Sequence, residues 1–320
     1  MDHDQELVTV FGGAGFVGTQ IVQLLAQRGH RIRVAVRRPD LAGHLRPLWA
    51  VGQIAPIQAN VRSRESVEHA VRGATIVINL VGIGFERGNQ NFGAIHVAGA
   101  RHVAEAAAAA GAHTLLHMSI LGADPDSPSP MARSRAAGEA EVVAAFPEAI
   151  IFRPSLIFGP GDSFFNLLGT LARLAPVLPL IGGRSKAQPV YVKDVAAAFA
   201  AAADGAAKAG RIYELGGPDI ETQRQLMERV LRDTGRSNPL LPLGPGLAKL
   251  MIAPLGLMPR PLVTGDQVDM LGTDNVVSAD AIREKRTLAA FGITPTPMEA
   301  VLPSYLWRFR KNGQFDRQTA

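Results

Sequence analysis

The sequence contains no cysteine, and tyrosine occupies only three of its 320 positions. The absence of cysteine excludes disulfides, thiolate metal sites and a cysteine nucleophile, and it suits a reducing compartment. Residues 1–6 (MDHDQE) are acidic and lead directly into an apolar run, so we expect no secretory signal. Such a signal needs a positive start and a longer apolar stretch, so we do not expect secretion.

The chain also lacks an apolar run that is long enough to cross a membrane. Its most apolar late segment, Leu240–Leu262, contains five prolines, which prevent a regular membrane-spanning helix. This segment and the aromatic and basic residues 307–311 (WRFRK) have two interpretations. They either cover the core of a second domain, or form a docking surface for a membrane-proximal partner or for lipid headgroups.

Basic residues outnumber acidic residues by 33 to 28, which gives a net charge of +5. An anionic lipid surface or an acidic protein partner is compatible with this excess. No block of lysine and arginine is interleaved with aromatic residues, so we do not expect nucleic acid as a partner. With 47% hydrophobic and 19% charged residues, the composition is typical of a folded globular chain.

Short apolar runs alternate with helical patterns over the first half of the chain. Continuous apolar runs of this length are typical of buried parallel strands. We expect strands at Leu7–Phe11, Arg31–Arg37, Gln53–Gln58, Thr75–Val81, Thr114–Ser119 and Ala149–Arg153, with helices at about 17–28, 64–72, 93–111 and 132–145. This alternation predicts an α/β fold with a doubly wound parallel sheet of the Rossmann type.

The pattern changes after Phe158, where glycine and proline become frequent and the helical patterns shorten. Residues 189–194 and Arg211–Leu215 are typical of isolated strands. We therefore expect a Rossmann-type domain over residues 1–155 and a smaller, irregular α/β lobe over residues 156–320. Some return of the chain between the two is expected.

A glycine-rich turn directly follows the first expected strand. Gly12, Gly15 and Gly18 have the GxxGxxG spacing, and the first helical pattern begins within this turn. Glycines at these positions allow a tight turn, a close approach of the backbone to a pyrophosphate, and packing of helix on strand. Because the motif lies between a strand and a helix, it predicts a dinucleotide site, and the alternative is a purely structural turn.

The end of the second expected strand indicates which dinucleotide is bound. An NAD site usually has an acidic residue there for the ribose hydroxyls, but this chain has Arg37 and Arg38. Two guanidinium groups favour a 2′-phosphate, so NADP(H) is the preferred cofactor. Asp40 keeps NAD(H) possible, and a solvated basic loop is the alternative without a ligand.

These features resemble the atypical and extended short-chain dehydrogenase/reductase superfamily over nearly the whole chain. The resemblance is carried by the glycine turn, Asn60-Val61, and residues 77–82 (VINLVG), 117–119 (HMS), 131–139 (MARSRAAGE) and 152–160 (FRPSLIFGP). Within the superfamily the chain is most similar to the nucleotide-binding accessory subunit of respiratory complex I and its bacterial relatives. That narrower similarity lies in residues 31–40 (RIRVAVRRPD), 188–195 (QPVYVKDV), 213–218 (YELGGP) and 302–310 (LPSYLWRFR).

The resemblance implies contacts along a whole bound dinucleotide. They are Gly12, Gly15, Phe16, Val17 and Gly18 at the pyrophosphate; Arg37 and Arg38 at the adenosine phosphate; Asn60 and Val61 at adenine; Leu80, Val81 and Gly82 along the ribose; and Pro154, Ser155 and Leu156 at the nicotinamide. Ser119 and Arg135 complete the expected set, with Arg135 at the ribose hydroxyls.

The catalytic pair of the superfamily is missing. Working members carry Tyr-x-x-x-Lys on one helix face, where the lysine lowers the pKa of a tyrosine that transfers a proton. This chain has Met131 and Arg135 at the two positions, and methionine has no exchangeable proton. Ser119 lies one place from the usual catalytic serine or threonine. We therefore expect no catalytic residue, and dehydrogenase, epimerase or dehydratase chemistry is in doubt.

Other catalytic arrangements are weaker still. Four scattered histidines have no carboxylate cluster at ligand spacing, so we expect no metal site. They are His96, His102, His113 and His117. Ser155 has no histidine and acid arrangement nearby that would predict a hydrolase. Asp162 and Asp194 are expected to be loop and helix-cap residues.

The leading hypothesis is a non-catalytic, NADP(H)-binding accessory or assembly subunit of NADH:ubiquinone oxidoreductase. The first alternative is an active NADP-dependent reductase of a quinone or hydrophobic carbonyl, and the second is a redox-sensing scaffold in quinone metabolism. The resemblance implies complex I subunits near the quinone site as partners, together with an anionic membrane surface. It also implies a cytoplasmic protein that is peripheral on the cytoplasmic or matrix-side face of the energy-transducing membrane.

Overall fold

The computed structural model describes residues 6–252, 263–311 and 313. The chain divides into two compact units, and each is assembled from separate segments of the sequence. The first unit comprises residues 1–154, 192–215 and 278–294, and the second comprises residues 155–191, 216–277 and 295–320. The chain thus leaves the first unit at Pro154 and returns to it twice.

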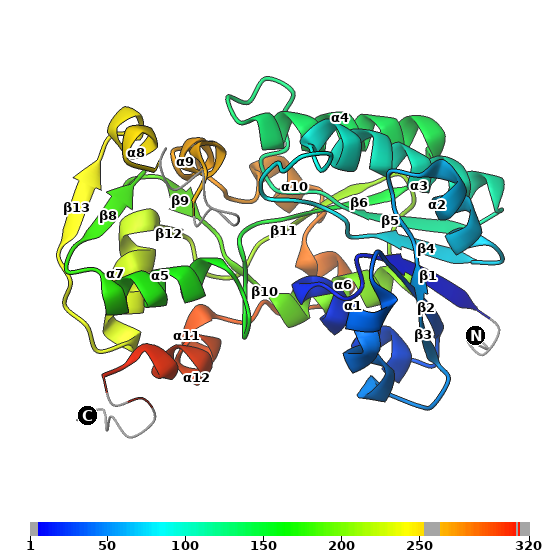
Figure 1. The fold of residues 1–320 in the computed structure, drawn as a ribbon, viewed down its shortest axis with the longest axis horizontal. Coiled ribbons are helices and arrows are strands. Elements are labelled where there is room, and N and C mark those ends of the chain that lie inside the picture. Colours follow the sequence, from blue (N-terminus) through cyan, green and yellow to red (C-terminus); the bar gives the residue numbers. More distant parts are fainter. Residues whose placement is uncertain (1–5, 253–262, 312, 314–320) are drawn as a thin grey trace. The chain divides into compact units, whose positions relative to one another are not determined.

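A seven-stranded parallel sheet forms the centre of the first unit (Figure 1). Its strand order is β11-β6-β5-β4-β1-β2-β3. The strands are β1 (Leu7–Phe11), β2 (Arg31–Val36), β3 (Ile54–Gln58), β4 (Ile76–Asn79), β5 (Thr114–Met118), β6 (Ile150–Pro154) and β11 (Ile212–Leu215). Every neighbouring pair is parallel, which confirms the predicted doubly wound α/β fold.

Helices cover both faces of this sheet. On one face α3 packs against α2 and α4, and on the other α1 packs against α6 (Figure 1). The helices are α1 (Phe16–Gln27), α2 (Arg64–Val71), the π-helical η3 (Gly93–Ala98) continued by α3 (Gly99–Ala109), α4 (Pro130–Ala145), α6 (Val192–Ala203) and α10 (Ala279–Arg283). The four predicted helices are confirmed within about two residues at each end. Two 3₁₀ segments, η2 (Pro39–Leu48) and η5 (Leu288–Phe291), were not predicted.

The isolated strand predicted at Arg211–Leu215 is wrong. Residues 212–215 form β11, which pairs with β6 and extends the main sheet. Buried aromatic packing holds this strand and the returning segments together, because Phe152 lies 4.3 to 5.8 Å, between ring centroids, from Phe199, Tyr213 and Phe291. A four-residue apolar run does not encode which sheet it joins.

The strand predicted over residues 189–194 is shorter than expected. Only Val190–Tyr191 forms a strand, β10, and α6 begins at Val192. The alanine-rich sequence that follows has high helix propensity, which accounts for the early start of the helix.

The second unit contains three two-stranded ribbons and short helices. The strand pairs are β7 (Ile157–Phe158) with β10 (Val190–Tyr191), β8 (Leu178–Ile181) with β13 (Leu240–Leu243), and β9 (Lys186–Ala187) with β12 (Glu221–Thr222). The helices are α5 (Phe164–Leu174), α7 (Gln223–Asp233), α8 (Pro245–Ile252), α9 (Gly265–Leu271), α11 (Met298–Val301), α12 (Pro303–Leu306) and the 3₁₀ turn η6 (Trp307–Phe309).

A buried polar contact fixes the C-terminal helices within the second unit. The Tyr305 hydroxyl donates to Asp162 Oδ2 at 2.5 Å, while Asp162 Oδ1 accepts from the Phe165 N–H at 2.7 Å at the start of α5. The predicted capping role of Asp162 is therefore confirmed. Asp194 lies buried in the first turn of α6.

The apolar segment Leu240–Leu262 is described only in part. Residues 253–262 lie outside the described residues, and the preceding part forms β13 and α8. On α8 the side chains of Leu247, Leu250 and Met251 are exposed. Among the described residues, no helix combines the length and the apolar character that crossing a membrane requires.

Candidate functional site

The glycine turn joins β1 to α1, and there is no room for a side chain at Gly13 or Gly18. Gly12 has a φ of 79°, which favours glycine, and its carbonyl accepts from the Gly15 N–H at 3.1 Å. A Cβ atom on Gly18 would lie 2.4 Å from the Gly12 oxygen. Helix α1 therefore starts directly at the sheet edge, where the first-turn N–H groups of Phe16, Val17 and Gly18 lack acceptors within the helix.

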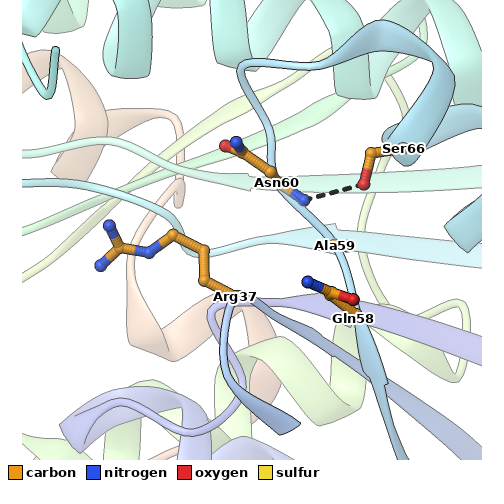
Figure 2. Close-up of a pocket in the computed structure, with 5 residues that line it drawn as sticks. All are labelled: Arg37, Gln58, Ala59, Asn60 and Ser66. Carbon is orange, nitrogen blue, oxygen red and sulfur yellow. Dashed lines mark hydrogen bonds between the residues drawn. The ribbon is translucent and has the colours of Figure 1, made fainter.

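A pocket of about 250 Å³ lies beside this turn, at the ends of β2 and β3. It is lined by Arg37, Gln58, Ala59, Asn60 and Ser66. In Figure 2 the Arg37 and Asn60 side chains extend to the same side from neighbouring strand ends. The Asn60 N–H donates to Ser66 Oγ at 3.0 Å, which ties this strand end to α2. Gln58, Ala59 and Ser66 were not among the predicted site residues.

The two predicted arginines differ in their surroundings. Arg37 Nη1 donates to Gln90 Oε1 at 2.5 Å and the side chain lines the pocket. Arg38 is exposed and makes two hydrogen bonds, at 3.0 and 2.6 Å, to the carboxylate of Asp40. Of these two arginines, only Arg37 therefore lines the pocket. The charge of Arg38 is neutralised by Asp40.

Val61 and Arg62 follow Asn60 and have different environments. The Val61 side chain is buried in the core beside Gly99, and its carbonyl interacts with His102 Nδ1 at 2.8 Å. Arg62 Nη1 donates to the Asn89 carbonyl at 3.1 Å, whereas its buried Nε has no hydrogen-bond partner among the described residues. A charged residue after a strand is common, so Arg62 could not be singled out from the sequence.

On the other side of β1, Leu80, Val81 and Gly82 follow β4. The Leu80 N–H donates to the Phe11 carbonyl at 3.0 Å, so this segment continues along β1. Gly82 is exposed, and a Cβ atom there would lie 1.8 Å from Arg135 Nη2. The guanidinium of Arg135 therefore lies directly against the backbone of Gly82.

Arg135 is a buried cation held by backbone oxygens. Its Nη1 donates to the Met118 carbonyl at 3.2 Å and to the Val81 carbonyl at 3.5 Å, at the carboxyl ends of β5 and β4. Its Nε has no hydrogen-bond partner among the described residues. Burial lowers the pKa of Arg135 to about 10, and the charge of Glu139 partly offsets this effect. The Glu139 carboxylate forms an ion pair with Arg153 at 2.6 Å.

Two histidines near Arg135 are held neutral. Burial, and then the charge of Arg135, lower the pKa of both His96 and His117 to about 3. His96 Nε2 accepts from the Ile83 N–H at 3.0 Å, which assigns the proton to Nδ1, the atom 2.8 Å from Ser134 Oγ. The sequence did not single these histidines out for such a role.

The first turn of α4 places Met131 one helical turn before Arg135, as the spacing predicted. Ser129 caps this helix, with its Oγ accepting from the Ala132 N–H at 3.1 Å. The tyrosines offer no replacement in this frame. Within the first unit, the hydroxyl of Tyr213 accepts from the Lys208 N–H at 2.9 Å. No described group at Met131 supplies a proton in the usual manner.

The remaining predicted residues lie at the ends of β5 and β6. Ser119 is buried, and its Oγ has no hydrogen-bond partner among the described residues. Pro154 ends β6, and its carbonyl accepts from the Leu121 N–H at 2.8 Å. Ser155 and Leu156 belong to the second unit, where the Ser155 hydroxyl donates to Asn275 Oδ1 at 2.5 Å. That hydroxyl is therefore engaged within the protein.

These features fit a dinucleotide. The first N–H groups of α1 lack acceptors within the helix, and the pocket with Arg37 suits a phosphorylated ribose. Near the ends of β4 and β5, the buried atoms Arg135 Nε and Ser119 Oγ have no hydrogen-bond partner within the part of the chain that the structure describes. Buried polar groups normally have partners, so unsatisfied ones at this edge are consistent with a polar ligand. No group of three or more potential metal ligands occurs among the described residues.

Comparison with known proteins identifies the family. Residues 8–216 match the model of the NAD dependent epimerase/dehydratase family. The chain belongs to this family. The matched residues contain the whole glycine turn, the Arg135 helix and every strand of the main sheet except the start of β1.

Individual relatives extend the match over the chain. The mitochondrial NADH dehydrogenase (ubiquinone) 1 alpha subcomplex subunit 9 of Arabidopsis thaliana is 36% identical over 325 residues, covering 96% of this chain and 79% of that protein. A ceramide reductase of Caulobacter vibrioides is 36% identical over 195 residues, covering 61% and 60%. An NADPH-dependent quinone oxidoreductase of Escherichia coli, solved with NADPH, has a TM-score of 0.75 at 20% identity, covering 94% of this chain and 99% of that one. The similarity to the quinone oxidoreductase is a similarity of fold alone.

The neutral histidines predict a specific loss of stability in acid. A histidine in the unfolded chain binds a proton near pH 6.5, but His96 and His117 do so only near pH 3 in the fold. Between these values the unfolded state binds more protons, so the free energy of unfolding falls as the pH falls. The slope is about 1.4 kcal/mol per pH unit for each histidine.

We expect His117→Asn to reduce this slope by about 1.4 kcal/mol per pH unit between pH 4 and 6. Urea unfolding at a series of pH values measures it. The matched control is His69→Asn, because His69 is exposed on α2. An unchanged slope in His117→Asn would contradict the assignment.

Proposed function

We propose that this protein is a non-catalytic, NADP(H)-binding accessory or assembly subunit of NADH:ubiquinone oxidoreductase. One observation carries the proposal: an intact glycine turn is combined with Met131 and a buried Arg135 in place of the Tyr-x-x-x-Lys pair. The fold is equipped to hold a nicotinamide dinucleotide and lacks the usual proton donor. The Arabidopsis thaliana relative, which is named as a subunit of this oxidoreductase, supports the assignment over 96% of the chain.

The cofactor is held by the carboxyl edge of the sheet in this proposal. The α1 amino terminus with Gly12, Gly15 and Gly18 binds the pyrophosphate. Arg37 and Asn60 receive the adenosine half, and Arg135 receives the nicotinamide ribose. When bound, the dinucleotide supplies charge and buried surface that stabilise the fold, and in a working reductase it would also supply a hydride.

Arg37 is the reason to prefer NADP(H) over NAD(H). Its guanidinium is exposed in the pocket, where it donates to the neutral amide of Gln90. A 2′-phosphate would offer this cation a negatively charged acceptor and therefore an ion pair, which the Gln90 amide does not provide. The Arg38 guanidinium contributes less, because Asp40 already neutralises it.

Partner and location follow from the same proposal. We place the protein at the membrane-facing side of the oxidoreductase, near its quinone site, as a peripheral subunit on the cytoplasmic or matrix-side face. The exposed apolar side chains of Leu247, Leu250 and Met251 on α8 suit a protein or lipid contact.

The bound nucleotide should act as a structural element. A ligand that binds only the folded state stabilises it by about 2.7 kcal/mol at a hundredfold excess over its dissociation constant. We expect NADPH to raise the melting temperature of nucleotide-free protein by several degrees, and Gly15→Trp to abolish the rise. Gly15 is exposed, with φ of −78°, so the variant should fold while blocking the pyrophosphate.

Thermal melts with and without saturating NADPH make this measurement. The matched control is Gly43→Trp, because Gly43 is exposed and a Cβ atom there meets nothing within 4 Å. If the melts of the parent protein with and without NADPH are superimposable, the cofactor has no structural role.

The cofactor preference should depend on Arg37. We expect the parent protein to bind NADPH more tightly than NADH, and Arg37→Asp to weaken NADPH binding by about tenfold or more, since charge-assisted hydrogen bonds contribute about 1.5–3 kcal/mol. Calorimetric titration of both cofactors measures the difference. Arg46→Asp in η2 makes the same change of charge at an exposed position and should leave the preference intact. Equal affinities of the parent protein for NADPH and NADH would refute the predicted preference.

Association with the oxidoreductase is directly measurable. We expect the protein, tagged and produced at its native level, to co-migrate with NADH:ubiquinone oxidoreductase activity after membranes are solubilised in mild detergent. Mass spectrometry of the purified sample should identify the other subunits. Migration as a free protein, with no loss of assembled oxidoreductase in a deletion strain, would exclude the accessory and assembly roles.

A second candidate is an active NADP-dependent reductase of a hydrophobic carbonyl. The ceramide reductase of Caulobacter vibrioides, which is 36% identical over 195 residues, favours it. The buried hydroxyl of Ser119, without a partner among the described residues, is the group closest in type to a family catalytic residue. The weakness of this candidate is the missing proton donor at Met131.

Turnover separates the two candidates. General acid–base help is typically worth 10²–10⁴-fold, so we expect NADPH oxidation with carbonyl and quinone substrates to stay well below about 1 s⁻¹. Stopped-flow NADPH fluorescence over a substrate panel measures it. The double variant Met131→Tyr with Arg135→Lys tests whether the site is otherwise intact. Substrate-dependent turnover near 1 s⁻¹ in the parent protein would favour the reductase.

A further inference from the structure

Arg135 brings a positive charge to one defined half of the dinucleotide site. In a doubly wound sheet the ligand lies across the carboxyl ends of the strands where the strand order reverses, with its two nucleotides on opposite sides. Here β1 marks that point, with β2 and β3 on one side and β4, β5 and β6 on the other. The adenosine half belongs with Arg37 after β2, so the nicotinamide half faces the ends of β4 and β5, where Arg135 lies.

The charge of Arg135 is compensated only in part, by the charge of Glu139. No described carboxylate lies within ion-pair distance of its guanidinium, and Glu139, one turn further along α4, is bound to Arg153 at 2.6 Å. His96 and His117 are the other titratable groups packed around it, and both are neutral at physiological pH. The residue one turn before it on α4 is Met131, where a tyrosinate would offer a negative charge in the usual family pair.

The two redox states of the cofactor differ in charge at this half. The nicotinamide ring of NADP⁺ carries a positive charge, and hydride addition makes the ring of NADPH neutral. We propose that Arg135 makes the site selective for redox state, so that the protein binds NADPH more tightly than NADP⁺. This inference rests on the proposed cofactor site and gives it a function: occupancy follows the NADPH/NADP⁺ ratio.

The size of the effect follows from Coulomb's law. At an effective dielectric constant of about 20, two unit charges repel enough to change a dissociation constant by about tenfold when they lie about 12 Å apart, and by more when they lie closer. A tenfold tighter binding of the reduced form raises the midpoint potential of the bound two-electron couple by about 30 mV. Both quantities are measurable without any turnover.

The experiment uses nucleotide-free, full-length protein and calorimetric titration with NADPH and with NADP⁺. We expect a ratio of dissociation constants of about ten in the parent protein, which Arg135→Met reduces to near one and Arg135→Lys retains. Arg133→Met is the matched control, because Arg133 lies two residues earlier on α4, is exposed and donates to the Ser127 and Pro128 carbonyls. Its ratio should equal that of the parent.

The outcomes separate this inference from the proposal on which it rests. Equal binding of NADPH and NADP⁺ by the parent protein, or a ratio that survives in Arg135→Met, overturns the redox selectivity while the cofactor site stands. Binding of neither nucleotide overturns both. If Arg135→Met does not fold, the parent ratio and the midpoint potential of the bound couple still decide, since a potential equal to that of the free couple contradicts the inference.

Discussion

Parallel pairing throughout the main sheet is the constraint on which the rest of the first unit depends. Strands that are buried on both faces need helical crossovers, and these return every strand in the same direction. All the carboxyl ends then meet at one edge. The glycine turn after β1, Arg37 after β2, Asn60 after β3 and Ser119 after β5 lie together for this reason, although they are far apart in the sequence.

At that edge, Arg135 is the residue that departs most from the family pattern. A buried guanidinium without a carboxylate loses most of its hydration, and two backbone carbonyls restore only part of it. Burial, and then this charge, lower the pKa of His96 and His117 to about 3, so both histidines beside Arg135 are neutral at physiological pH. A buried cation that has lost most of its hydration is poorly suited to proton transfer. It is well suited to sensing or holding a charged ligand.

The cofactor turn and the missing donor are independent features, and their combination explains how a dehydrogenase-type fold can serve in an assembly. Holding a dinucleotide requires only the glycine turn and the strand ends. Reducing a substrate also requires a proton donor at the correct position. The family usually provides a tyrosine there, and this chain has Met131 instead. Under the proposed function, methionine at position 131 would separate binding from chemistry while the fold remains intact.

The sequence by itself determined the features that depend on local spacing. Continuous apolar runs located β1 to β6, the GxxGxxG spacing located the turn, and the four-residue interval placed Met131 and Arg135 on one helix face. Tertiary structure alone decided that residues 212–215 join the main sheet, that Arg37 rather than Arg38 lines the pocket, and that Val61 is buried in the core. Backbone conformation is encoded over a few neighbouring residues, whereas strand partners, burial and the neutrality of two histidines depend on groups that only folding brings together.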